Sequence, residues 1–137
     1  MAKSKELEGM IPHHVGISVP DLEASIKWYC EMLDFEVVKR GRVEAAHANN
    51  AFLKNGDFYI EIFQPEKPLP QPPGQDYPPT AVAVIGTRHI AYAVKDLIKA
   101  SEYLEKKGVD IVMKRPDGSI HFMRDNFGIL VELMPMW

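Results

Sequence analysis

The chain has 137 residues, of which 46% are apolar, so it is long enough for one domain with a hydrophobic core and too short for two ordinary domains. Its formal charge of −3 and the scatter of its sixteen Lys and Arg residues give no basic field for binding nucleic acid. No run approaches the ~20 apolar residues of a membrane span, and residues 1–12 lack the apolar core of a signal peptide. We therefore expect a cytoplasmic protein with small-molecule partners, and its single cysteine, Cys30, fits a reducing compartment.

The first half of the chain predicts one strand, one helix and three further strands. Residues 13–19 resemble a short strand, and Asp21 follows them as a residue suited to cap a helix. Apolar residues then recur at three-to-four spacing, which predicts a helix that starts near Leu22 and buries one face. The turn signal at residues 55–57 punctuates the three strands expected after it. This half therefore forms a βαβββ unit.

Residues 66–87 are expected to form a linker between the halves. Together with Pro65 they hold seven of the eleven prolines, and proline disfavours both helix and central strand. A connection of this length is either a functional flap or a spacer between modules, and the sequence leaves both interpretations open.

The second half repeats the pattern of the first. Residues 88–94 form the expected strand, Asp96 caps a helix starting near Leu97, and Gly108 ends it. A shift of 75 residues superposes residues 14–40 on 89–115. It matches His14 with His89, Val19 with Val94, Asp21 with Asp96, Leu22 with Leu97, Val37 with Val112, Lys39 with Lys114 and Arg40 with Arg115. The sequence thus predicts a single α+β domain over residues 1–137, in which two tandem βαβββ modules, about 12–65 and 88–135, form a curved mixed sheet around a cleft.

Four polar residues at equivalent positions form a candidate metal site. Glu61 and Glu132 each lie among apolar residues of the last strand of a module, where an ionised carboxylate costs several kcal/mol unless a cation or strong hydrogen bonds compensate it. His14 and His89 begin the two modules. If the modules pack with twofold pseudosymmetry, these four side chains can converge on one divalent ion, and the ligand set suits Zn, Ni, Co, Mn or Fe(II). His13 is the rival ligand, but the equal spacing from His14 to Asp21 and from His89 to Asp96 selects His14.

Further side chains are candidates for the substrate pocket beside the ion. Strand alternation places small residues next to the two histidines, which leaves room for a substrate. The candidate pocket residues are Tyr59, Phe63, His121 and Met134. Glu44, His47 and His121 are candidates for a second acid or base. Arg40, Arg42, Arg115 and Arg124 are candidates for contact with an anionic substrate group, although solvated surface positions are their default.

The residues that begin and end the modules resemble the vicinal oxygen chelate (VOC) superfamily, which includes glyoxalase I, methylmalonyl-CoA epimerase, extradiol dioxygenases and bleomycin- or fosfomycin-resistance proteins. The resemblance rests on His14-Val15-Gly16-Ile17-Ser18-Val19-Pro20-Asp21-Leu22, on His89-Ile90-Ala91-Tyr92-Ala93-Val94-Lys95-Asp96-Leu97 and on Phe127-Gly128-Ile129-Leu130-Val131-Glu132-Leu133. It implies the paired βαβββ fold and metal binding. The complete His, Glu, His, Glu set is similar to glyoxalase I and, among the family's chemistries, favours proton transfer; no residues map onto a glutathione or coenzyme A site.

The resemblance implies a glyoxalase-type isomerase, epimerase or lyase that removes a proton next to a metal-bound carbonyl of a small substrate, with Glu132 as the first choice of base and Glu61 as the second. One alternative is an Fe(II) extradiol-type ring-cleaving dioxygenase that uses His14, His89 and Glu132. Another is a metal-free ligand-binding or resistance protein. In this superfamily the modules pair within one chain or between two, and a homodimer is the default expectation.

Overall fold

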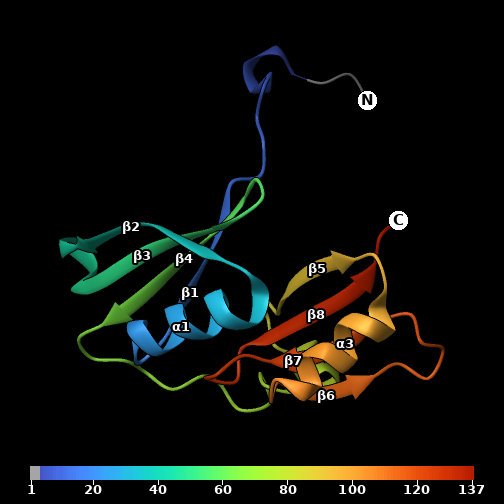
Figure 1. Ribbon diagram of the computed structural model, residues 1–137. Coiled ribbons are helices and arrows are strands. Elements are labelled where there is room, and N and C mark those ends of the chain that lie inside the picture. Colours follow the sequence, from blue (N-terminus) through green and yellow to red (C-terminus); the bar gives the residue numbers. More distant parts are fainter. Residues whose placement is uncertain (1–3) are drawn as a thin grey trace.

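The computed structural model describes residues 4–137, and its first module contains one helix and four strands (Figure 1). The elements are β1 (His14–Ser18), α1 (Leu22–Leu33), β2 (Glu36–Val43), β3 (Ala48–Asn55) and β4 (Phe58–Pro65), with short 3-10 turns η1 (Lys5–Leu7) and η2 (Glu44–Ala46). The sheet order is β1-β4-β3-β2, in which β1 runs parallel to β4 and the other neighbours are antiparallel. The predicted βαβββ unit is confirmed.

The second module repeats this topology. It comprises β5 (Ile90–Val94), α3 (Leu97–Lys106), β6 (Asp110–Lys114), β7 (His121–Arg124) and β8 (Leu130–Pro135), in the sheet order β5-β8-β7-β6. The α+β class is therefore confirmed, with one difference in detail. The two modules form separate four-stranded sheets in the chain rather than one continuous curved sheet.

Both long helices begin at the predicted aspartates. The side chain of Asp21 accepts a hydrogen bond from the backbone N–H of Ala24, and Asp96 does the same for Lys99. Each cap satisfies one of the N–H groups that lack a partner in the first turn of a helix. The helices thus start at Leu22 and Leu97, as predicted.

The alignment of the halves changes by one residue after the helices. α1 has 12 residues and ends at Asp34 in the left-handed conformation, whereas α3 has 10 residues and Gly108 takes the left-handed position. From that point the equivalent residues differ by 74 rather than 75, so Lys39 corresponds to Met113 and not to Lys114. The sheet pairing supports this, because both β2 and β6 carry a bulge just before that position.

The two modules share their core through α1. Trp28 and Leu33 pack against the apolar clusters of both modules. The fully buried Tyr29 donates a hydrogen bond of 2.8 Å to Asp125 in the turn between β7 and β8. The Lys107 ammonium group also donates to the backbone carbonyl of Glu31, so the carboxyl ends of α1 and α3 are joined.

The linker is more ordered than its prolines suggest. It contains a short helix, α2 (Pro78–Ala81), because proline is tolerated in the first turn of a helix, where an N–H group is not needed. The Arg88 guanidinium donates hydrogen bonds to the linker carbonyls of Ala81, Ile85 and Gly86. These bonds hold the end of the linker against the start of β5.

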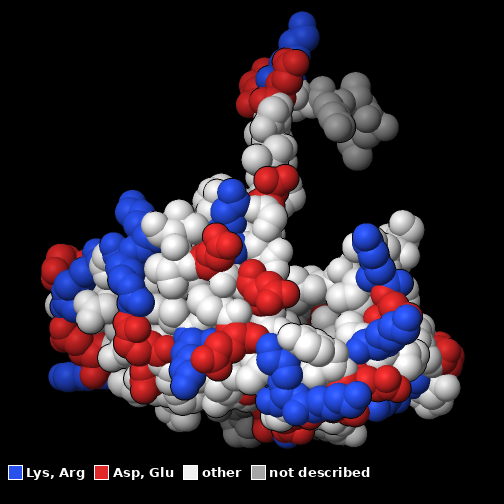
Figure 2. Space-filling model, in the orientation of Figure 1, with Lys and Arg blue, Asp and Glu red and all other residues white. Residues whose placement is uncertain are grey.

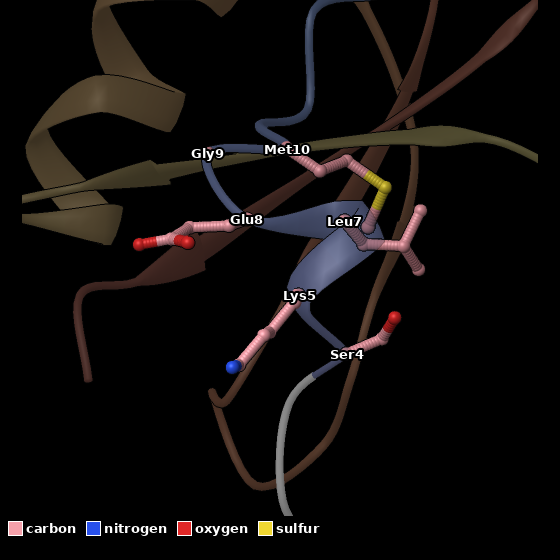
Figure 3. Close-up of a pocket in the computed structure, with 6 residues that line it drawn as sticks. All are labelled: Ser4, Lys5, Leu7, Glu8, Gly9 and Met10. Carbon is pink, nitrogen blue, oxygen red and sulfur yellow. The ribbon is translucent and has the colours of Figure 1, made fainter.

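The N-terminal segment projects from the two modules (Figure 1). A hollow of about 590 Å³ is lined by residues of this segment alone, namely Ser4, Lys5, Leu7, Glu8, Gly9 and Met10 (Figure 3). All six are exposed, and none belongs to the predicted site. Within residues 4–137, no helix has the length and apolar character needed to cross a membrane.

Candidate metal centre

The first module brings His14 and Glu61 together. Parallel pairing of β1 with β4 sets Tyr59 opposite His14 and Glu61 opposite Gly16, so the histidine and glutamate share one face of the sheet. His14 Nε2 lies 3.4 Å from Glu61 Oε2. The other ring nitrogen, Nδ1, lies 2.9 Å from Nδ1 of His13, whose ring stacks on Tyr59. His13 therefore contacts the Nδ1 side of the His14 ring, and the Nε2 atom of His14 points toward the carboxylate of Glu61.

The second module brings His89 and Glu132 together in the same way. His89 Nε2 lies 2.8 Å from Glu132 Oε2, and Glu132 stands opposite Ala91 in the pairing of β5 with β8. An aromatic ring completes each pair. Phe52 lies edge-on to His14 and opposite Glu61, and Phe122 lies edge-on to His89 and opposite Glu132.

Among residues 4–137, the two carboxylates have no partner with a permanent positive charge. The side chains of Glu61 and Glu132 are only 14% and 15% exposed, yet within residues 4–137 neither forms an ion pair with a lysine or arginine. A carboxylate removed from water needs a cation or several hydrogen bonds. Neutral imidazole nitrogen and carboxylate oxygen are ligands that borderline divalent metals accept, so the residues present fit such an ion.

Each module contains one His–Glu pair, and the two pairs do not meet within the described part of the chain. In the described part of the chain, no three His, Cys, Asp or Glu side chains come together closely enough to hold an ion. His14 begins β1 and His89 directly precedes β5, and among residues 4–137 both are edge strands with a sheet neighbour on one side only. The halves are therefore built alike and held apart within one chain.

A family model described as the Glyoxalase/Bleomycin resistance protein/Dioxygenase superfamily matches residues 11–133. The chain belongs to this superfamily. The match includes both half-sites and the linker, and the predicted VOC resemblance is confirmed.

Relatives and solved structures support the same assignment. The protein YwkD of Bacillus subtilis (strain 168) is 33% identical over 106 residues, which are 77% of each chain. The glyoxalase family protein from Enterococcus faecalis superposes with a TM-score of 0.73 and 25% identity, covering 93% of this chain and 98% of that one. Glyoxalase I from Zea mays superposes with a TM-score of 0.65 and 27% identity over 90% of this chain, which spans 43% of the maize chain.

The other residues that the sequence assigned to the pocket of this superfamily member fall on two different faces. Tyr59 and Phe63 follow the alternation of Glu61, and Met134 follows that of Glu132, so these three share the faces of the half-sites. His121 does not. It is 4% exposed and its Nδ1 lies 2.8 Å from Ser101 Oγ of α3, so it faces the helix, and burial lowers its pKa.

The other two candidates for a second acid or base lie in the turn between β2 and β3. Glu44 is in η2 rather than in a strand and pairs with Arg42, and His47 ends that turn in the left-handed conformation. Both are exposed. We therefore leave Glu44, His47 and His121 out of the proposed pocket.

One residue of the site was missed from the sequence. Asn50 is 8% exposed and donates a hydrogen bond of 2.8 Å from Nδ2 to Glu61 Oε1. It stands two residues before Phe52 in β3, and the corresponding position before Phe122 is Ile120. An amide therefore holds one oxygen of Glu61, whereas the equivalent position beside Glu132 is apolar. In the sequence, Asn50 is only a polar residue at the start of an apolar stretch. Its contact with Glu61 could be predicted only if the register of β3 and β4 were known.

Proposed function

We propose that this protein is a divalent-metal-dependent isomerase, epimerase or lyase of the glyoxalase type, which acts on a small carbonyl compound. The observation that carries the proposal is the pair of equivalent His–Glu couples, each with a covered carboxylate that has no lysine or arginine partner among residues 4–137. His14, Glu61, His89 and Glu132 hold the ion in this proposal. The similarity to the maize enzyme, named glyoxalase I, supports the same class of reaction.

Two copies of the chain complete the site in this proposal. Because the half-sites do not meet within one chain, His14 and Glu61 of one copy face His89 and Glu132 of the other. A twofold dimer contains two such sites, because each copy contributes its first module to one site and its second module to the other. The free edges of β1 and β5 provide the surfaces on which the copies associate.

Glu132 is the proposed base. The bound ion would supply a Lewis acid for the carbonyl oxygen. Glu132 takes the proton from the carbon next to that carbonyl, and returning it to another carbon or to the other face gives isomerisation or epimerisation. Glu61 is the second choice, because its Oε1 already accepts a hydrogen bond from Asn50, which leaves it less free to take a proton.

Metal content and proton exchange test the proposal together. We expect one divalent ion per chain by elemental analysis after refilling, and loss of that ion in His14→Ala but not in His47→Ala, which removes an exposed histidine outside the site. Glu132→Gln should abolish exchange of the substrate's α-proton with solvent deuterium, and the exposed control Glu102→Gln should not. Absence of specific metal uptake by the wild-type protein would contradict the proposal and favour a metal-free binding protein. Uptake of oxygen with a catechol, on iron alone, would favour the ring-cleaving dioxygenase.

A further inference from the structure

The sheet register aligns one row of side chains across each half-site. In the first module the row runs Lys39, Phe52, Glu61 and Gly16, from β2 through β3 and β4 to β1. In the second module the equivalent row is Met113, Phe122, Glu132 and Ala91. The rows match at the aromatic ring, the glutamate and the small residue. They differ at the outer end, where a lysine replaces a methionine.

Lys39 lies on the same face as the metal ligands. Because side chains opposite each other in a sheet share a face, Lys39 projects on the side of Phe52 and Glu61. Two strand spacings, about 10 Å in all, separate the backbone of Lys39 from that of Glu61. The flexible stem of a lysine allows its ammonium group to reach over Phe52 toward a molecule bound at the glutamate.

Lys39 lies in the row of Phe52 and Glu61, and no carboxylate among residues 4–137 pairs with it. It is exposed, and it takes part in none of the ion pairs found among residues 4–137. Arg124 also lies on the face of its half-site, but it is bound to Asp110 at 3.2 Å and to Asp76 at 3.8 Å. On the face of the molecule that Figure 2 shows, acidic and basic side chains lie intermixed.

The remaining cations near the half-sites are less well placed. Lys54 stands opposite Glu36 and lies over the Tyr59 ring, with Nζ 5.7 Å from its centre. Arg40 pairs with Glu23 of α1, on the helix side of the sheet. Arg115 lies beyond the end of β6, outside the paired strands of its half-site.

We propose that Lys39 binds an anionic group of the substrate, so that the substrate class is a small carbonyl compound carrying a carboxylate or a phosphate. This inference rests on the proposed function, because the carbonyl is taken to lie at Glu61 and Glu132. Module 1 contributes the cationic end of the pocket, and Met113 and Met134 of module 2 contribute an apolar end. A substrate with one charged end then binds in a single orientation, which selects the carbon that faces Glu132.

Matched probes test the inference. The first pair is hydroxyacetone phosphate with hydroxyacetone, and the second is levulinate with 2-pentanone; each pair differs in its anionic group. Binding to the zinc-loaded protein is measured by titration calorimetry, and exchange of α-protons in D₂O is followed by NMR. The variant Lys39→Met gives module 1 the residue that module 2 has, and Lys99→Met removes an exposed lysine on α3 as the control.

We expect the wild-type protein to bind at least one anionic probe more tightly than its neutral partner. Lys39→Met should weaken that binding about tenfold, since a hydrogen bond to a charged group is lost, and it should raise KM more than it lowers kcat. Lys99→Met should match the wild type. Tighter binding of hydroxyacetone phosphate alone identifies phosphate as the group, and tighter binding of levulinate alone identifies carboxylate.

Equal binding of charged and neutral probes would overturn the inference, and so would an unchanged dissociation constant in Lys39→Met. A loss confined to Lys54→Met or Arg115→Met would also overturn it. Failure of the proposed function is distinguishable, because the wild-type protein would then exchange no α-proton of any probe. In that case the calorimetric comparison of Lys39→Met with Lys99→Met still decides whether Lys39 binds the anion.

Discussion

Replacing Tyr29 by Phe removes one hydroxyl group from the contact between the modules. Tyr29 is fully buried, and its hydroxyl donates to Asp125 Oδ2 at 2.8 Å. The other carboxylate oxygen, Oδ1, accepts from the backbone N–H groups of Phe127 and Ile129 at 2.9 and 3.0 Å. Phe fills almost the same space as Tyr, so the variant leaves the packing intact and deprives a buried carboxylate of one donor.

The expected loss of unfolding free energy is about 1.5–3 kcal/mol, the usual contribution of a hydrogen bond to a charged group. For a chain of this size, that loss lowers the melting temperature by roughly 5–10 °C. Thermal or urea unfolding at pH 7 measures it. Tyr103→Phe is the matched control, because Tyr103 is 55% exposed and its hydroxyl contacts Lys107 Nζ at 3.2 Å. For this variant we expect a change in unfolding free energy below about 0.5 kcal/mol.

The effect of Tyr29→Phe also depends on pH. Burial raises the pKa of the Asp125 carboxyl above its ordinary value, and the bond from Tyr29 is one of the contacts that lower it again. Without that bond the pKa of the folded state is higher still. The destabilisation is therefore largest above this raised pKa, where the carboxyl is ionised, and it shrinks as the pH falls and Asp125 takes up a proton. A Tyr29→Phe protein as stable as the wild type at pH 7 would refute this reasoning.

Three further changes give distinct results. Asn50→Leu removes the donor to Glu61 and should weaken zinc binding by about 10- to 100-fold in a chelator competition, and an unchanged affinity would show that the amide has no such role. Gly16→Ala places a Cβ 3.3 Å from the Phe63 ring and should cost about 1 kcal/mol in urea unfolding, which Phe63→Leu in the same chain should relieve. Burial lowers the pKa of His121 in the folded state, so protonation of this histidine below pH 7 favours unfolding. His121→Gln should therefore lose less unfolding free energy between pH 7 and 5 than the wild type. An unaltered pH profile of stability would show that His121 does not cause this loss.

Most of the helices and strands could be predicted from local sequence patterns. Strand alternation, helical spacing and the capping residues Asp21 and Asp96 depend on neighbours in the sequence, and they predicted the strands and helices of both modules. The linker was not predicted correctly in this way, because proline breaks a helix in its interior but is tolerated in its first turn. Pro78 begins a helical turn where the number of prolines indicated none.

The candidate site was only partly readable, because several of its features depend on sheet register. The face of His121 could not be found from the sequence, because both of its neighbours, Ile120 and Phe122, are apolar. The pairing of Phe122 with Glu132 turns His121 toward α3. The equivalence of Lys39 with Met113 required the length of α3, which is shorter than α1. The separation of the half-sites within one chain follows from how α1 joins the modules, which no local pattern encodes.

The most direct measurement is the metal content of a mixed dimer of His14→Ala and His89→Ala, purified through two different tags. If two copies share each site, one site of the mixed dimer carries both substitutions and the other is intact. We expect two ions in the wild-type dimer, one in the mixed dimer and none in either homodimer of the variants. A mixed dimer without an ion, beside a wild-type dimer with two, would contradict a site built between two copies.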